Sequence, residues 1–286
     1  MINPPIQNEP VGFQQIDYAR VEMNPNNPPW NSGIALAVWA LSVLLIIFVP
    51  TLLLIPYIVS RAVPGMDAVQ ITEIATKDPT ALVIQVAAIL PVHLLTLFIS
   101  WYVVTNFRKY RFLQTLGWNS GGVRWWHHLL ILGGFVSLMV LVGMLIPEQE
   151  NDLLRILKSS KLALYTVAFL AVFTAPLVEE VVYRGVLYSA FQRSLGRFAA
   201  IALVTFLFAL VHVPQYWPSY STIFLLTVLS LILTLVRVYS GNLLPCVILH
   251  TIFNGFQSAL LIAEPHVNVP GGPKAEQAIS FILGLR

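Results

Sequence analysis

Charged side chains are scarce in this sequence. Of its 286 residues, 10% are charged and 57% are hydrophobic, and the mean hydropathy is +0.76. An ordinary soluble domain carries about 25% charged residues. So few charges cannot solvate a globular surface of this size, which excludes a soluble enzyme, a disordered protein and a nucleic-acid binder. The composition instead indicates a membrane protein with several spanning helices.

Cysteine and the common hydrolase motifs are also lacking. Cys246 is the single cysteine, so an intrachain disulfide and a thiolate-ligated metal site are both excluded. No Gly-x-Ser-x-Gly motif marks a nucleophilic serine, and no His-Glu-x-x-His motif is present. Any hydrolysis would therefore proceed without a nucleophilic side chain, on carboxylates, imidazoles and amides.

The beginning of the chain is polar and rich in proline and asparagine. Repeated prolines block helix formation and offer no apolar face, so residues 1–33 are predicted to form a disordered or extended tail. We divide the rest into N-terminal transmembrane helices and loops at 34–160, a segment with polar motifs at 161–263, and a C-terminal tail at 264–286.

Long apolar runs predict an all-α bundle of transmembrane helices. A spanning helix needs about 20 mainly apolar residues. Seven segments meet this requirement, namely 34–59, 81–104, 128–146, 162–191, 198–213, 222–238 and 243–263. An eighth span would follow if the fourth segment were two helices.

The distribution of basic residues predicts an orientation in the cell membrane. The loop after the second span is the most basic, with Arg108, Lys109, Arg111 and Arg124. The positive-inside rule places this loop, and with it the N-terminus, in the cytoplasm. Arg155, Lys158 and Lys161 on the opposite side make the bias small.

Polar residues inside the spans are gathered in three motifs. Ionisable residues there cost several kcal/mol unless they are paired or hydrated, so they are candidates for function. The motifs are Glu179-Glu180-x-x-x-Arg184, Phe208-x-x-x-His212 and His250-x-x-x-Asn254.

Each motif also has a structural interpretation. Glu180 and Arg184 are four residues apart and can simply neutralise each other. His212 lies near the end of its span, where an interfacial histidine is common. His250 and Asn254 can form hydrogen bonds between helices. His93 is isolated in the second span and is predicted to be structural.

The depth of these residues favours a shared polar cavity. Counted from one membrane side at 1.5 Å per residue, Glu179, His212 and Asn254 lie about 18, 21 and 20 Å deep, and His250 about 14 Å. A carboxylate in such a cavity can take a proton from water that an imidazole orients. A second imidazole and an amide can stabilise the developing oxyanion.

In this order the three motifs resemble the signature of the CAAX-protease and bacteriocin-processing family of intramembrane proteases, also called the Abi family. Leu116-Gly117-Trp118 is similar to a segment common ahead of the family domain, which would occupy residues 161–263. The resemblance implies an endopeptidase or self-immunity protein in the membrane. Nothing in the sequence indicates that the substrate is prenylated.

The resemblance also implies roles for individual residues. Glu179 would be the base, and His212 would help to activate the water. Glu180 and Arg184 would orient the base, and His250 and Asn254 would line the oxyanion hole.

Two other hypotheses stay open at this point. Glu179, His212 and His250 could bind a catalytic zinc with water as the fourth ligand. A catalytically silent scaffold or transporter is the other, although a transporter would be expected to show internal repeats, and none is visible. We favour the metal-free protease without a cofactor, because Asn254 and Arg184 suit charge stabilisation by organic groups. Its partners would be a peptide or protein substrate that reaches the membrane and the lipid bilayer, and no nucleic acid.

Overall fold

The structure is a computed structural model that describes residues 23–146, 149 and 151–263. These residues form helices and no β-strand, which confirms the predicted all-α class. Seven helical stretches in the described part are long and apolar enough to cross a membrane. The chain is therefore a multi-pass membrane protein, and its described residues contain the seven spans that the sequence predicts.

The helices follow the predicted apolar segments to within a few residues at most ends. The spans are α1 (Ser32–Arg61), α3 and α4 together (Pro79–Ala87 and Ile89–Val104), α6 (Trp125–Leu145), the run Lys161–Leu195, α11 (Arg197–Tyr216), α12 (Tyr220–Ser240) and α13 (Leu244–Ala263). Three short helices lie between spans, namely α2 (Ala68–Lys77), α5 (Phe112–Leu116) and α7 (Asp152–Ser159).

The fourth span is one continuous helical run, so the described residues contain no eighth span. It consists of α8 (Lys161–Phe169), the π-helix η1 (Leu170–Thr174), α9 (Ala175–Glu180), the π-helix η2 (Val181–Leu187) and α10 (Tyr188–Leu195). The apolar pattern continued past two glutamates because a single helix carries them.

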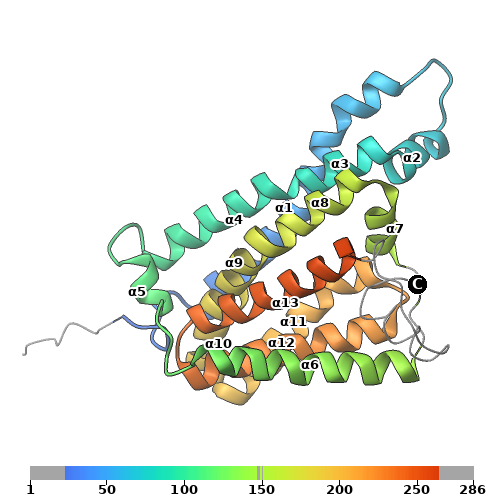
Figure 1. Ribbon diagram of the computed structural model, residues 1–286. Coiled ribbons are helices and arrows are strands. Elements are labelled where there is room, and N and C mark those ends of the chain that lie inside the picture. The colour runs from blue at the N-terminus through green and yellow to red at the C-terminus, as the bar shows by residue number, and fades with distance from the viewer. Residues whose placement is uncertain (1–22, 147–148, 150, 264–286) are drawn as a thin grey trace, which may run out of the picture.

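The fourth span lies between two groups of helices (Figure 1). On one side α1 and α4 pack against each other, and both contact η2. On the other side α13 contacts η1 and α9, and it also packs on α6 and α12. The segment with the two glutamates is therefore enclosed from both sides.

The segment before α1 was predicted to be disordered or extended, and its described part, residues 23–31, is without helix and is held by hydrogen bonds. Trp30 Nε1 donates a 2.9 Å hydrogen bond to the carbonyl of Val186, and Arg193 Nη2 donates one of 2.9 Å to the carbonyl of Trp30. Arg237 Nη2 donates to the carbonyl of Pro25 at 2.7 Å. These hydrogen bonds hold a segment that its prolines keep out of a helix, so residues 23–31 form a strap over one end of the bundle. The remainder of that tail, residues 1–22, and the predicted C-terminal tail 264–286 lie outside the described residues.

The turn after α5 contacts two elements that carry polar motifs, namely η2 and α13. Gly117 has a φ of +77°, and its carbonyl accepts hydrogen bonds from the N–H groups of Leu243 and Leu244 at 2.8 and 3.3 Å. The neighbouring Leu116 packs on Gly185 in η2, where an added Cβ would lie 2.9 Å from Leu116 Cδ2. The Leu116–Trp118 segment thus fixes the start of α13 against η2.

Candidate active site

The two glutamates end a short α-helix between two π-helical stretches. π-Helical turns are rare, and they occur frequently at functional sites. They alter the helical phase, so they set the directions of the side chains in α9 relative to the rest of the span. The side chain of Glu180 is fully buried, whereas that of Glu179 is 24% exposed. The adjacent carboxylates therefore occupy different environments.

Glu180 is held by a cation and an imidazole. Its Oε1 accepts hydrogen bonds from Arg184 Nη1 at 3.0 Å and from His250 Nδ1 at 2.9 Å. The Arg184 pairing is the one that the four-residue spacing predicted. Because a carboxylate only accepts, His250 donates from Nδ1, and this contact joins the fourth span to α13.

Three further hydrogen bonds hold the buried Arg184. Its Nη2 donates to the carbonyl and the hydroxyl of Ser230 at 2.8 Å each, and its Nε donates to Thr234 Oγ1 at 3.3 Å. The guanidinium lies 4.7 Å from the centre of the Phe208 ring. A buried cation needs such compensation, and these contacts orient Arg184 toward Glu180 rather than Glu179.

Glu179 faces the other nitrogen of the same imidazole. Its Oε2 lies 3.8 Å from His250 Nε2, and the carboxylate makes no hydrogen bond to another described side chain or backbone group. A neutral His250 that donates from Nδ1 carries a lone pair on Nε2, so only the imidazolium form can donate from Nε2. The protonation state of His250 therefore decides whether it acts as an acceptor or as a donor beside Glu179.

His212 approaches this group through Phe208. Its Nδ1 donates to the carbonyl of Phe208 at 2.7 Å, which leaves Nε2 for another partner. The Phe208 ring centre lies 4.7 Å from that of His212 and 6.2 Å from that of His250. The phenylalanine of the second motif is thus an apolar wall between two imidazoles and above the guanidinium of Arg184.

Asn254 has a structural contact as well as a place in the motif. Its Nδ2 donates a 2.8 Å hydrogen bond to the carbonyl of Ala171 in η1. An amide nitrogen carries two hydrogens, so one remains for another acceptor. The contact between helices that was the structural interpretation of Asn254 is present, and its role in an oxyanion hole stays a prediction.

His93 was predicted to be structural, and the structure gives it a contact with the fourth span. The side chain is buried, and its Nδ1 lies 2.8 Å from the hydroxyl of Thr174, the last residue of η1. Thr174 donates its own hydrogen to the carbonyl of Leu170 at 3.1 Å, so the ring donates to Thr174. No spacing in the sequence connects the second span to the fourth, which is why the sequence did not predict this partner.

Tyr183 is a second residue that the motifs did not single out. Its hydroxyl accepts a 3.1 Å hydrogen bond from Trp39 Nε1, and its ring meets the edge of Phe208 at 5.0 Å. Through Tyr183 and Thr174, the helices α1 and α4 contact the fourth span on either side of Glu179 in the sequence.

The zinc hypothesis requires three side chains to converge on one point. Within residues 23–146, 149 and 151–263, no three His, Cys, Asp or Glu side chains are grouped in a way that could hold a metal ion. His212 and His250 each use Nδ1 for a hydrogen bond to the protein, an arrangement that leaves Nε2 free and is also usual for histidines that bind a metal. What the structure lacks is the grouping, because Glu179, His212 and His250 do not converge as a three-ligand zinc site in the described arrangement. The absence of a cofactor stays a prediction.

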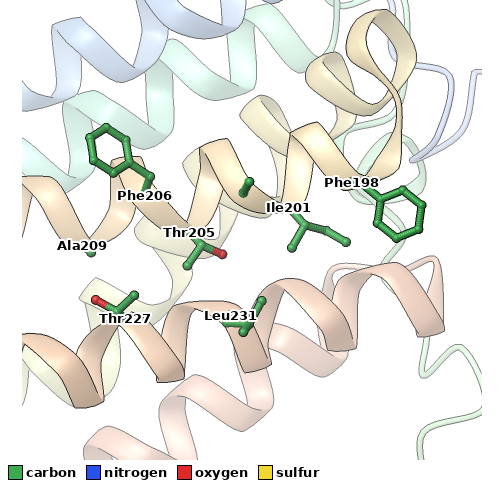
Figure 2. A pocket seen from close by; sticks show the side chains of 8 residues that line it. Phe198, Ile201, Thr205, Phe206, Ala209, Thr227 and Leu231 are labelled. Atoms are coloured by element: carbon green, nitrogen blue, oxygen red, sulfur yellow. The ribbon is translucent and has the colours of Figure 1, made fainter.

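A hollow between α11 and α12 is distinct from this cluster (Figure 2). It has a volume of about 420 Å³ and contains none of the predicted site residues. Mainly apolar side chains from the two helices line it, namely Phe198, Ile201, Ala202, Thr205, Phe206, Ala209, Thr227 and Leu231. Such a lining suits contact with lipid chains and offers no group for acid–base chemistry.

Comparison with known proteins supports the interpretation of the motifs. Neither a curated protein nor a solved structure gives a significant match to the chain. Residues 161–256 match the profile of the Rce1-like family, type II CAAX prenyl endopeptidase Rce1-like. The match begins at the first residue of α8 and contains all three motifs. It confirms the predicted family resemblance, which covers residues 161–256 of this multi-pass membrane protein.

Proposed function

We propose that the protein is an intramembrane endopeptidase in which Glu179 removes a proton from the attacking water. The observation that carries this proposal is that the two adjacent glutamates differ in burial and in hydrogen-bond partners. Glu180 is enclosed, and Arg184 and His250 donate to it. Glu179 is partly exposed, keeps its oxygens for another partner, and lies 3.8 Å from an imidazole nitrogen. A general base needs an accessible carboxylate, and the carboxylate of Glu180 is not accessible.

The proposed reaction has two steps. Water adds to the carbonyl carbon of the scissile peptide bond while its proton passes to Glu179, and the carbonyl oxygen becomes an oxyanion. The carbon–nitrogen bond then breaks as the protonated Glu179 returns the proton to the leaving amine. One water is consumed, and a carboxylic acid and an amine are formed. His212 Nε2, which carries a lone pair, would accept a hydrogen bond from the water and orient it.

His250 and Asn254 would stabilise the oxyanion. His250 fulfils this role as an imidazolium, which donates Nδ1–H to Glu180 and offers Nε2–H to the substrate. The carboxylate of Glu180 accepts from that Nδ1–H, and Arg184 fixes the position of the carboxylate. Asn254 would contribute the amide hydrogen that Ala171 does not use. Fixed donors of this kind, away from bulk water, stabilise developing charge more strongly than water does.

A peptide library tests the activity. The purified full-length protein in detergent is incubated with peptides that carry free, prenylated or blocked C-terminal segments, and the products are identified by mass spectrometry. The proposal predicts cleavage by the wild type, and a loss of about 100- to 10,000-fold in Glu179→Gln. A wild type that cleaves nothing in membranes or in detergent, while it still binds peptides, would favour the scaffold hypothesis.

Metal analysis of the same preparations tests the zinc alternative. The metal-free mechanism predicts that chelation leaves the wild-type rate unchanged and that His250→Ala slows turnover without releasing metal. Stoichiometric zinc that is lost together with activity in His212→Ala would establish the zinc enzyme instead.

A further inference from the structure

The loop between α4 and α5 carries positive charge without nearby negative charge. Arg108, Lys109 and Arg111 follow one another closely, and neither residues 79–147 nor residues 181–263 contain an aspartate or glutamate. In the part of the chain that the structure describes, none of these three side chains forms an ion pair. The loop therefore presents cations that the folded chain does not neutralise.

Two of these cations line one hollow. It has a volume of about 600 Å³, and the residues that line it include two arginines, two residues with a hydroxyl group, a glutamine and three aromatic residues. The lining residues are Trp101, Thr105, Arg108, Tyr110, Arg111, Phe112, Leu113 and Gln114. Lys109 lies between the two arginines in the sequence but is not part of the wall. Two of the three neighbouring cations therefore line the hollow.

The loop that carries these cations has an unusual backbone conformation. Asn106, Phe107 and Arg108 have φ values of 43°, 59° and 72°, a left-handed conformation that residues with a Cβ rarely adopt, least of all three times in succession. The N–H groups of Arg108 and Tyr110 hold the turn by hydrogen bonds to Thr105 Oγ1 and to its carbonyl, at 3.1 and 2.9 Å. Such strain is found preferentially where a ligand is held.

The hollow lies at the edge of the membrane. The second span ends at Val104, the residue before the loop, and Trp101 lines the hollow one turn earlier. Tryptophan near the end of a span marks the level of the lipid headgroups. Arginine binds phosphate through two parallel hydrogen bonds, and the ring of Trp101 and the side chain of Leu113 suit the adjoining glycerol and acyl region.

We propose that this hollow binds the phosphate group of an anionic phospholipid. Arg108 and Arg111 would each donate to phosphate oxygens, and Tyr110 and Gln114 would supply further donors to the headgroup. The site is separate from the cluster around Glu179, and the proposal does not depend on the proteolytic activity.

Lipid binding to the full-length protein tests the proposal. Purified protein in a neutral detergent is titrated with phosphatidylglycerol or phosphatidylcholine, and retained lipid is counted by native mass spectrometry. We expect the wild type to retain one phosphatidylglycerol in preference to phosphatidylcholine. Arg108→Gln and Arg111→Gln should each weaken that binding about 10- to 100-fold, as expected for the loss of a charge-assisted hydrogen bond. Arg111→Lys, which keeps the charge but loses the planar fork, should give a smaller loss.

Lys109→Gln is the matched control, because it removes a charge from the same loop but not from the wall of the hollow. The site predicts a change in affinity of less than about twofold for this variant, whereas diffuse attraction of a basic surface predicts equal losses in all three variants. Equal losses, or no preference for phosphatidylglycerol, would overturn the proposal. Glycerol 3-phosphate that binds as tightly as phosphatidylglycerol would overturn the assignment to lipid. Melting curves in lipid-free detergent show whether each variant is folded.

Discussion

Two adjacent residues, Glu179 and Glu180, have different chemistry because a helix separates them by about 100° of rotation. Glu180 turns toward Arg184 and His250, and Glu179 turns toward the accessible side of the same imidazole. The pairing of Glu180 with Arg184 was predictable from their spacing within one helix. The shared use of His250 was not, because it depends on how α13 is rotated against the fourth span.

Asn254 allows a prediction with a magnitude. If its free amide hydrogen binds the oxyanion, Asn254→Ala should slow the chemical step about 100- to 1,000-fold with little change in substrate affinity. The bond to Ala171 should add only a small loss of stability, since hydrogen bonds between membrane helices average about 0.6 kcal/mol. Single-turnover kinetics and a melting curve in detergent measure the two effects separately.

The purely structural role of Asn254 makes the opposite prediction. If the contact with Ala171 is all that Asn254 supplies, Asn254→Ala melts slightly earlier and turns over at the wild-type rate per folded molecule. That outcome would remove Asn254 from the oxyanion hole.

The π-helical turn η1 links the N-terminal spans to the glutamates. Thr174 ends η1 and accepts from His93 on α4, while Asn254 on α13 donates to Ala171 at the other end of the turn. Two helices therefore hold the turn from which α9 starts. The conformation of this turn determines the direction of the side chains of α9, so a change in η1 should displace Glu179.

Substitutions at Thr174 test this link between elements. Thr174→Val keeps the shape but removes the hydroxyl, and it should lower turnover about 10- to 100-fold, since small misplacements of a catalytic group are costly. Thr174→Ser keeps the hydroxyl and should retain most of the rate. Turnover per folded molecule is the quantity to compare.

Thr96 provides the control on α4. It is buried one turn beyond His93, and its hydroxyl has no hydrogen-bond partner among the described residues. Thr96→Val should leave the rate unchanged. Equal rates in Thr174→Val and Thr174→Ser would show that the hydroxyl does not position Glu179.

The sequence predicted the elements better than their internal geometry. Apolar runs located all seven spans, because burial in lipid requires about 20 apolar residues regardless of the fold. The π-helical turns around Glu179 and Glu180 left no comparable signal, since they depend on packing against α4 and α13. The partner of His93 was not predicted for the same reason, because a contact between spans has no fixed spacing.

At the scale of the whole molecule, two arginines, the exposed Arg193 and the buried Arg237, hold the N-terminal strap on the bundle. Arg237 on α12 is buried, and it donates to Pro25, Asn26 and Ser189. The proline-rich composition of this segment does not predict that it is ordered, because its hydrogen-bond partners lie more than 150 residues away in the sequence.

Loss of Arg237 should therefore weaken the fold. Arg237→Gln should destabilise the protein by about 1.5–3 kcal/mol, the range for hydrogen bonds to a charged group. Arg197→Gln, which removes an exposed cation at the same end, should change stability by less than about 0.5 kcal/mol. Hydrogen exchange of residues 23–31 should rise in the first variant only. Unchanged exchange in Arg237→Gln would show that Arg237 does not hold the strap.

The proposed mechanism depends on which of the two glutamates is the base. Single-turnover cleavage by Glu179→Gln and Glu180→Gln tests this assignment most directly, with each rate corrected for the folded fraction of the variant. Glu179→Gln should fold and melt like the wild type, yet lose about 100- to 10,000-fold of the cleavage rate. Glu180→Gln leaves Arg184 as an uncompensated buried charge and should be destabilised by about 3–5 kcal/mol, while its folded molecules keep a measurable rate. A Glu179→Gln variant that cleaves at the wild-type rate, beside a folded but inactive Glu180→Gln, would contradict the assignment.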